Sequence, residues 1–276
     1  MIIWPNNKRF AATLSFDLDA ESSWESSSLN GRRLSLLSMG AYGRRVAVPR
    51  LLDLLERYSI QAQFYIPGRI AEIDPEVVRS IAKAGHGIGC HGFFHERVDE
   101  MNPAENLKIL KDSKNILEQT IDREVCHYRA PLWEITPDVV QSLIDLGFHT
   151  DSSLMGDDRP YLVGGPEQSL LELPVSWLLD DFEQFAFSAE PAVGGVIEEP
   201  EKVYRMWAAE LAGMREFGSH FMLTMHPEVI GRPSRLMMLE NLIQLMRSQE
   251  DLWFCTPDSV YSHWKAGNIE LPLHPY

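Results

Sequence analysis

The sequence predicts an α/β fold whose largely parallel strands form a closed or partly closed barrel. Apolar segments typical of buried strands alternate along the chain with amphipathic segments typical of helices, the pattern of proteins built from β/α units. The chain has 276 residues and 45% of them are hydrophobic, which is enough for the core of one barrel-sized domain. Because no internal repeat divides the chain, we predict a single domain over residues 1–276.

The predicted elements take their bounds from this alternation and from the residues that begin and end helices. Pro75 begins one helix and Gly85 ends it, while Gly147 and Gly218 end two others. Strands are predicted at residues 11–17, 61–66, 86–91, 124–130, 148–151, 170–176, 220–225 and 252–255. Helices are predicted at residues 47–59, 75–84, 103–119, 136–146, 200–217, 234–249 and 257–265.

Residues 21–46 form the one long stretch that predicts neither a strand nor a helix. The stretch is rich in Ser, Gly and Arg, and it contains Trp24 and Tyr42. Long irregular loops are uncommon in compact domains and usually have a function. We therefore predict that this loop is a lid, a binding loop or an oligomer contact.

Net charge and cysteine content limit the possible binding partners and the cellular compartment of the protein. A net charge of −15 argues against nucleic acid and anionic membranes as partners. The three cysteines, Cys90, Cys126 and Cys255, are an odd number in apolar segments, which predicts no structural disulfide and a reducing compartment. Residues 1–9 do not resemble a secretion signal, and no apolar run approaches membrane-spanning length. We expect a cytoplasmic protein.

Two aspartates end the first predicted strand, in the segment ATLSFDLD at residues 12–19. Because side chains alternate along a strand, Asp17 and Asp19 share one face, and Phe16 and Leu18 share the other. Two ionised carboxylates so close together repel each other unless a cation neutralises them. The pair therefore favours a metal site.

Two histidines follow the third predicted strand, in the segment HGFFHE at residues 91–96. A spacing of four places His91 and His95 on the same side of a helical turn, with Cβ atoms about 5–6 Å apart. An isolated pair of histidines is more often part of a solvated loop or a core, but the nearby aspartates favour ligands. His86 has the wrong parity to join them, and we predict that it is buried and hydrogen-bonded.

Asp19, His91 and His95 together form a two-histidine, one-carboxylate set. Three protein ligands leave positions open on a catalytic Zn²⁺ ion, where a bound water becomes hydroxide near neutral pH. Asp17 is then left for proton transfer, which predicts a hydrolase. The same set also suits non-haem Fe(II) oxygenases, so the ligands alone leave the metal and the reaction open.

Four more side chains follow predicted strands, at the end where a barrel places its active site. Taken alone, Arg129 is explained by an ion pair and Trp133 by a core position. Asp151 is likewise explained by a helix cap and His226 by burial beside a proline. Because all four follow strands, we predict that they converge on the metal.

These segments, in this order, resemble the five successive motifs of the polysaccharide deacetylase superfamily (NodB homology, carbohydrate esterase family 4). The resemblance spans about residues 10 to 260, and residues 42–52 and 173–181 are similar to an intracellular branch of the superfamily. That branch contains allantoinase-like proteins, cyclic-imide hydrolases and a peptidoglycan-deacetylase-like protein. The motifs are SFDLD at residues 15–19, His91 and His95, Arg129 with Pro131 and Trp133, Asp151, and Leu223 with His226 and Pro227.

The resemblance implies a distorted (β/α) barrel of the NodB type, with about seven strands instead of the eight of a regular barrel. It implies one divalent metal on Asp19, His91 and His95, which we expect to be Zn²⁺, with Co²⁺, Mn²⁺ and Ni²⁺ as alternatives. Oligomers are common among the related intracellular proteins, so we expect a homo-oligomer, with a tetramer as our guess. The implied catalytic roles are Asp17 as base, His226 as acid, Arg129 as the residue that orients the base and Asp151 as the residue that tunes the acid.

Several positions depart from the deacetylase pattern and predict a remodelled pocket. Leu18 separates the two aspartates, Gly92 stands where Ser or Thr is usual, and Ser152 follows Asp151 where an aromatic residue is common. We therefore predict a hydrolase of carbon–nitrogen bonds in a small amide, cyclic imide or ureide. Alternatives are a polysaccharide or peptidoglycan N-deacetylase, a catalytically silent scaffold and, last, the oxygenase. The predicted substrate-binding residues are Trp24, Trp133, Trp177 and Asp180, with core packing as the alternative for the tryptophans.

Overall fold

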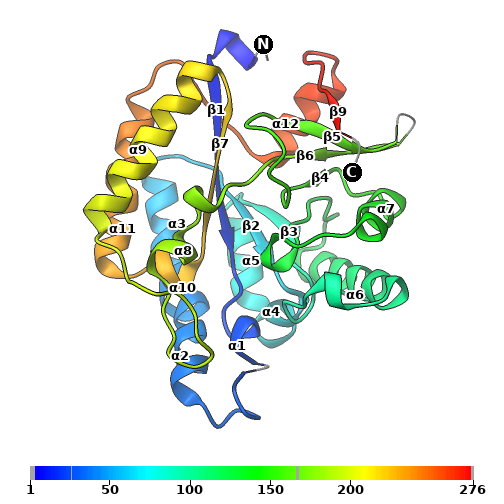
Figure 1. Ribbon diagram of the computed structural model, residues 1–276, viewed down its shortest axis with the longest axis vertical. Coiled ribbons are helices and arrows are strands. Elements are labelled where there is room, and N and C mark those ends of the chain that lie inside the picture. The colour runs from blue at the N-terminus through cyan, green and yellow to red at the C-terminus, as the bar shows by residue number, and fades with distance from the viewer. Residues whose placement is uncertain (1–3, 26, 166–167, 275–276) are drawn as a thin grey trace.

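The computed structural model describes residues 4–25, 27–165 and 168–274. A parallel sheet forms its centre, and β1 runs through the middle of that sheet (Figure 1). The strands β2 and β7 flank β1, β3 pairs with β2, and β8 pairs with the first residues of β1, before the start of β2. Their bounds are β1 Phe10–Asp17, β2 Gln63–Ile66, β3 Gly87–Cys90, β7 His220–Met225 and β8 Leu252–Phe254.

A smaller sheet and three isolated parallel bridges continue the wall of the barrel. The bridges Cys90 to Tyr128 and His127 to Thr150 connect β3 to β4, and a bridge from Asp180 to Thr224 joins β7. This arrangement confirms the predicted distorted barrel with largely parallel strands. The smaller sheet has the order β4-β6-β5-β9, with β4 Thr150–Asp151, β5 Tyr161–Gly164, β6 Ser169–Glu172 and β9 Leu273–His274.

The predicted strand at residues 124–130 is extended but forms no regular strand. The amides of His149 and Thr150 both donate to the carbonyl of Cys126, so the pairing there has no continuous register. For the same reason the predicted strand at residues 148–151 is reduced to the two residues of β4. The irregular wall lies where the chain turns into the candidate site, and β5 and β9 were not predicted.

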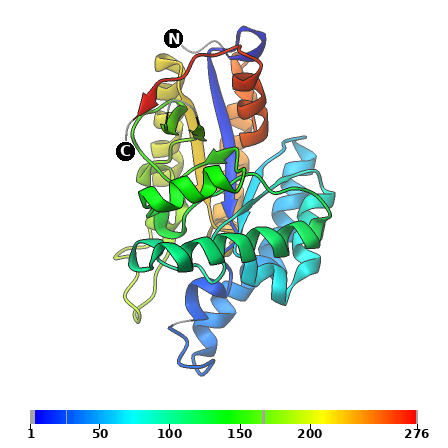
Figure 2. The same ribbon diagram turned by 90° about the vertical axis from the view of Figure 1, so that its right-hand side faces the viewer.

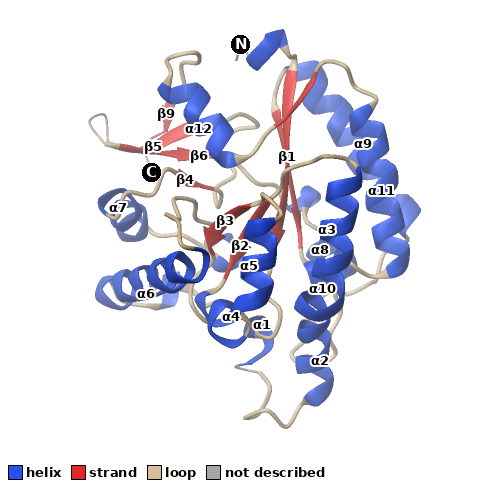
Figure 3. Cartoon of the chain, turned by 180° about the vertical axis from the view of Figure 1, so that it is seen from behind, coloured by secondary structure: helices blue, strands red, loops and turns tan. Residues whose placement is uncertain are grey.

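Helices surround the barrel, with α9 and α11 together on one side and α6 and α7 on the other (Figures 1 and 3). Figure 2 shows α6 and α7 crossing the same face of the molecule. All seven predicted helices are present with small shifts in their ends. Their bounds are α3 Val48–Arg57, α5 Pro75–Lys83, α6 Pro103–Ile121, α7 Pro137–Asp145, α9 Pro200–Phe217, α11 Pro233–Arg247 and α12 Pro257–Lys265. The short helices are α1 Ser22–Glu25, α2 Leu34–Tyr42, α4 Gly68–Ile73, α8 Asp181–Phe185 and α10 Pro227–Ile230.

The strand β1 separates the core from the polar interior of the barrel. Leu14 and Phe16 belong to the main hydrophobic core, and the ring of Phe16 stacks on Phe64 with centroids 4.8 Å apart. Ser15 and Asp17 alternate with them and are also buried. The apolar face therefore packs outward against helices, and the opposite face carries polar groups into the barrel.

Residues 21–46 are not an irregular loop, which corrects the prediction. Apart from residue 26, which lies outside the described residues, the segment contains α1, α2 and most of a π-helix at Gly43–Ala47 that leads into α3. Arg44 of the π-helix bonds Glu21 at 2.7 Å and Asp74 at 2.7 Å. These contacts between distant residues hold short helices that local sequence does not predict.

Two further expectations concern cysteines and membranes. Cys90, Cys126 and Cys255 are all buried and free, as predicted. Across the part of the chain that the structure describes, no helix combines the length and apolar character needed to span a bilayer.

Candidate active site

Asp19, His91 and His95 lie together beyond the carboxyl ends of β1 and β3. The distance from Asp19 Oδ1 to His91 Nε2 is 3.4 Å, and that from Asp19 Oδ2 to His95 Nε2 is 3.2 Å. One ligand atom from each residue lies within 4.8 Å of the other two. The structure therefore brings the predicted ligand set into a single cluster.

The loop that carries both histidines differs from the predicted helical turn. Residues 91–97 form no helix, and Gly92 and His95 have φ values of 66° and 62°. The carboxylate of Glu96 accepts hydrogen bonds at 2.9 and 2.8 Å from two backbone amides inside the loop. A Cβ atom on Gly92 would meet the Glu96 carboxylate and Pro131. The local backbone therefore requires glycine where Ser or Thr is usual, and the two imidazoles still end 5.1 Å apart.

The chemistry of this cluster fits a divalent metal. His91 Nδ1 donates a hydrogen bond of 2.8 Å to the carbonyl of Arg129, which leaves the lone pair of Nε2 on the side of Asp19. Ser23 Oγ donates to Asp19 Oδ2 at 2.9 Å, whereas the buried Oδ1 has no hydrogen-bond partner among the described residues. Burial raises the pKa of Asp19, but His95 and His91 lower it more strongly, below its ordinary value. An ionised carboxylate with an unpaired buried oxygen beside two imidazole nitrogens suits Zn²⁺.

Asp17 stands beside this cluster and is held by Arg129. Asp17 Oδ1 accepts a hydrogen bond of 2.7 Å from Arg129 Nη1, and Asp17 Oδ2 lies 3.8 Å from His91 Nε2. Arg129 is completely buried, and its guanidinium lies 4.3 Å from the centre of the Tyr65 ring. Burial lowers the pKa of Arg129, but the charge of Asp17 offsets this effect and raises it above its usual value. Arg129 therefore occupies Asp17 Oδ1, and Oδ2 is left on the side of His91.

His226 enters the site from the end of β7, immediately before α10. Its Nε2 lies 3.8 Å from Asp19 Oδ2, and its Nδ1 donates a hydrogen bond of 2.8 Å to Asp181 Oδ1. Asp180 Oδ1 is 3.6 Å from the same Nδ1. Burial lowers the pKa of His226, but Asp180 and Asp181 raise it well above its ordinary value. Asp181 therefore holds the ring through Nδ1 and leaves Nε2 on the side of Asp19.

Asp151 was predicted to tune His226, but the carboxylate that accepts a hydrogen bond from His226 Nδ1 belongs to Asp181. Asp151 accepts a hydrogen bond of 2.7 Å from Ser153 Oγ and lies beside Glu172, away from the His226 hydrogen bonds. The resemblance pointed to Asp151, which ends β4, whereas Asp181 comes shortly after the 3-10 helix Trp177–Leu179. Asp181 begins a short helix, where an acidic residue is usually explained by the helix terminus, so its sequence context carries no separate signal.

A cavity of 300 Å³ opens above these groups. Its walls include all four predicted substrate-binding residues: Trp24, Trp133, Trp177 and Asp180. The rings of Trp133 and Trp177 are 4.4 Å apart, and the Nε1 of the buried Trp24 has no hydrogen-bond partner among the described residues. The cavity therefore has flat apolar walls, the N–H donor of Trp24, and the side chains of Asp17 and His226 in its lining.

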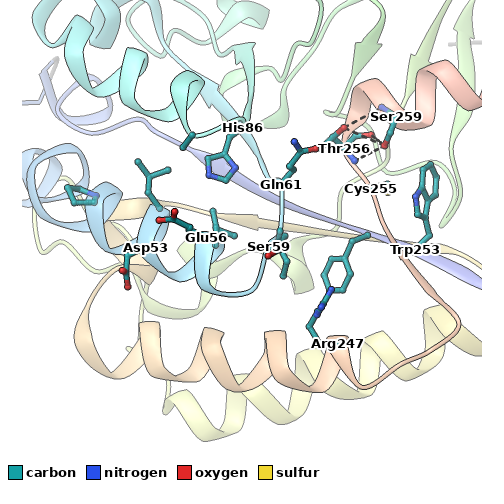
Figure 4. Close-up of a pocket in the computed structure, with 16 residues that line it drawn as sticks. Asp53, Glu56, Ser59, Gln61, His86, Arg247, Trp253, Cys255, Thr256 and Ser259 are labelled. Carbon is teal, nitrogen blue, oxygen red and sulfur yellow. Dashed lines mark hydrogen bonds between the residues drawn. The ribbon is translucent and has the colours of Figure 1, made fainter.

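A larger cleft of 860 Å³ lies elsewhere, between α3, the end of α11 and the start of α12 (Figure 4). Glu56, His86, Arg247 and Trp253 are among its lining residues, and none of the predicted site residues lines it. His86 is buried, and its Nδ1 accepts a hydrogen bond of 3.2 Å from the Ala62 amide. His86 is therefore the buried, hydrogen-bonded residue that its position in the strand predicted.

Comparisons with known proteins relate this chain to polysaccharide deacetylases. The family model for polysaccharide deacetylases matches residues 40–150. A peptidoglycan deacetylase of Helicobacter pylori is 28% identical, over 92% of this chain and 95% of that protein. A crystal structure of a Mycobacterium smegmatis protein described as a polysaccharide deacetylase is 37% identical with a TM-score of 0.93, covering 97% of this chain and 94% of that one. PuuE allantoinase shares the fold, with a TM-score of 0.83, 21% identity, and coverage of 95% of this chain and 92% of that one.

Proposed function

Because this chain belongs to the polysaccharide deacetylase family, we propose that it is a metal-dependent hydrolase of a small amide, cyclic imide or ureide. Membership of this family supports hydrolysis of carbon–nitrogen bonds. The dependence on a metal and the small size of the substrate are what we propose. One observation carries the proposal. Asp17 and His226, a base and an acid, each lie 3.8 Å from a residue of the candidate ligand set.

Each polar group has a chemical task in such a hydrolysis. Asp19, His91 and His95 would hold the metal, which when bound polarises a carbonyl and lowers the pKa of water. Asp17 accepts the proton of the attacking water, and Arg129 orients its carboxylate through a hydrogen bond of 2.7 Å.

His226 completes the reaction on the other side of the broken bond. Its protonated ring donates to the departing nitrogen through Nε2, while Asp181 fixes the tautomer from Nδ1. Amide nitrogen is a poor leaving group without a proton, so a histidine whose pKa is raised matches the reaction.

The form of the cavity supports a small substrate. Trp24, Trp133 and Trp177 line a cavity of 300 Å³, near the lower end of the range for small-molecule sites. The flat rings favour a planar amide, imide or ureide. N-deacetylation of a sugar is the second candidate, and the Helicobacter pylori peptidoglycan deacetylase, which aligns over 95% of its length, favours it.

The first experiment is to measure the metal content of the purified protein together with its hydrolysis of four substrates. Hydantoin, succinimide, allantoin and an N-acetylglucosamine oligomer are each assayed with and without a chelator. Ring opening that the chelator abolishes is the expected result. Acetate release from the oligomer alone would select the deacetylase instead.

A matched variant separates the metal from the rest of the site. We expect Asp19→Asn to lose both the bound metal and turnover, and exposed Asp53→Asn to keep both. Full activity of Asp19→Asn contradicts the proposal, and bound metal without turnover on any substrate leaves a catalytically silent scaffold.

A further inference from the structure

Two buried carboxyl groups lie side by side behind the candidate active site. Asp151 of β4 and Glu172 of β6 are register partners in a parallel pair, and both are completely buried. Paired residues on neighbouring parallel strands project to the same side of the sheet, with the strands about 4.8 Å apart. The two carboxyl groups are therefore neighbours in a site without water contact.

Their hydrogen bonds account for only one oxygen of each group. Asp151 Oδ1 accepts from Ser153 Oγ at 2.7 Å, and Glu172 Oε1 accepts from the amides of Ser153 and Leu154 at 3.0 and 2.9 Å. Asp151 Oδ2 and Glu172 Oε2 are buried and have no donor among the described residues. Two adjacent ionised carboxylates with unpaired oxygens are unstable, and one proton between them removes the repulsion and pairs both atoms.

We propose that Asp151 and Glu172 share one proton between Oδ2 and Oε2, and that this pair positions Arg129 for its contact with Asp17. The positioning part rests on the proposed function. Burial and the neighbouring Asp151 raise the pKa of Glu172 well above its usual value. Burial also raises the pKa of Asp151, but its contacts with Glu172 and Ser153 and the charge of Arg129 act in the opposite direction. Glu172 is therefore the proton carrier of the pair.

Hydrogen bonds to two adjacent residues, Ser152 and Ser153, link Arg129 and the pair through the backbone. Arg129 donates through Nε to the carbonyl of Ser152 at 3.0 Å and through Nη2 to Ser152 Oγ at 2.9 Å. The amide of Ala130 donates to Ser153 Oγ at 2.9 Å. Since Ser153 is held from behind by both carboxyl groups, the pair sets the position of the backbone on which Arg129 rests.

Three other ionisable side chains lie around Asp151 and Glu172, and none of them releases a proton to the pair. Tyr65 and Tyr128 are buried, and burial raises the pKa of each phenol above its usual value, so both are neutral. Arg129 is the cation whose charge acts on Asp151, and its Nη1 is already bound to Asp17. A carboxyl–carboxylate pair carries one negative charge in this buried site, whereas an ionised pair would carry two.

Amide variants test the shared proton without needing a substrate. In Glu172→Gln, the side-chain NH₂ takes the place of the acidic O–H, and in Asp151→Asn the new NH₂ faces ionised Glu172. We expect both single variants to fold with stability similar to the parent. The double variant Asp151→Asn with Glu172→Gln places two NH₂ groups face to face, and we expect it to be clearly less stable in urea than either single variant.

Infrared spectroscopy reports the proton directly. The parent protein at pH 7 is expected to show an absorption of a buried protonated carboxylic acid that Glu172→Gln lacks and exposed Glu56→Gln retains. Absence of this difference, or a double variant as stable as the single ones, overturns the shared proton. Neither measurement depends on turnover, so both remain decisive if the proposed function fails.

Turnover tests the positioning role. On a substrate identified by the panel above, we expect Glu172→Ala to lower kcat about 10- to 100-fold with bound metal unchanged, the usual size for a residue that orients an active group. Glu172→Gln should restore most of kcat, which a loss of general stability would not do. Unchanged kcat in folded Glu172→Ala overturns the positioning role. The shared proton is then decided by the infrared and urea measurements alone.

Discussion

At the scale of single residues, the structure assigns the acid histidine a partner. Two hydrogen bonds hold His226 in place. Asp181 Oδ1 accepts both of them, one from the backbone amide and one from Nδ1 of His226, each at 2.8 Å. Asp180 adds charge from 3.6 Å but carries a raised pKa of about 7, chiefly because it is buried. Asp181 is therefore the residue that orients the ring.

Replacement of Asp181 by Asn tests this assignment. The amide keeps the size of the side chain and removes the charge that holds the proton on His226, so kcat should fall about 10- to 100-fold. Because the lower pKa of His226 deprotonates the acid earlier, the alkaline limb of the kcat/KM profile should move to lower pH. A pH–rate profile with an unmoved alkaline limb would show that Asp181 does not tune the acid.

At the scale of elements, the segment from α1 to α3 is built on close packing against the end of β1. A Cβ atom on Gly40 of α2 would occupy the space of the Ala20 carbonyl, one residue after Asp19. Arg44 ties the same segment to Glu21 and Asp74. The segment also supplies Trp24 and Ser23 to the cavity, so it forms one wall of the site. Its predicted role as a lid or oligomer contact stays a prediction.

We expect Gly40→Ala to destabilise the protein by about 1–3 kcal/mol, because the backbone of Ala20 cannot move aside. The matched control is Gly213→Ala in α9, where a Cβ atom meets nothing within 4 Å. That substitution should stabilise the helix by about 0.5–1 kcal/mol. Urea denaturation of the two variants should therefore give shifts of opposite sign, and equal shifts would contradict the packing argument.

At the scale of the whole molecule, buried acids make stability depend on pH. Glu228 is buried without a partner for either oxygen among the residues described, and burial raises its pKa to about 8. The folded state therefore holds a proton that the unfolded state releases near its ordinary pKa of 4.5. The free energy of unfolding therefore has its full value, as far as Glu228 is concerned, at low pH, and it falls as the pH rises from about 4.5 to about 8.

We expect Glu228→Gln to remove this pH-dependent loss of stability. Relative to the parent, its free energy of unfolding should be higher at pH 8 than at pH 4.5 by on the order of 4 kcal/mol. Chelator-treated protein is unfolded with urea across this range, and exposed Glu56→Gln serves as the control. An unchanged pH dependence in Glu228→Gln would assign the effect to other groups.

Metal binding should also stabilise the whole fold, because its ligands come from two separate strand ends. Zn²⁺ at about 100 times its Kd adds about 2.7 kcal/mol to the free energy of unfolding. Thermal melts of chelator-treated protein with added Zn²⁺ should rise for the parent and for Asp53→Asn, but not for Asp19→Asn. Equal shifts for all three proteins would indicate binding outside the predicted ligands.

The order of elements and the candidate ligands follow from local pattern, which a sequence displays directly. Alternation predicted that Asp17 and Asp19 share a face, and the spacing predicted that His91 and His95 meet, although a loop and not a helix joins them. The short helices at residues 22–42 were missed because contacts between distant residues hold them.

By itself, the sequence determined the alternating α/β architecture, the candidate metal ligands and the resemblance to a hydrolase family. Only the tertiary structure decided which carboxylate serves His226 and that Asp151 pairs with Glu172. The physical reason is the distance along the chain between the residues in contact. Periodicity and spacing report neighbours within a few residues, whereas these contacts join segments 45 and 21 residues apart, whose meeting depends on how strands and helices pack.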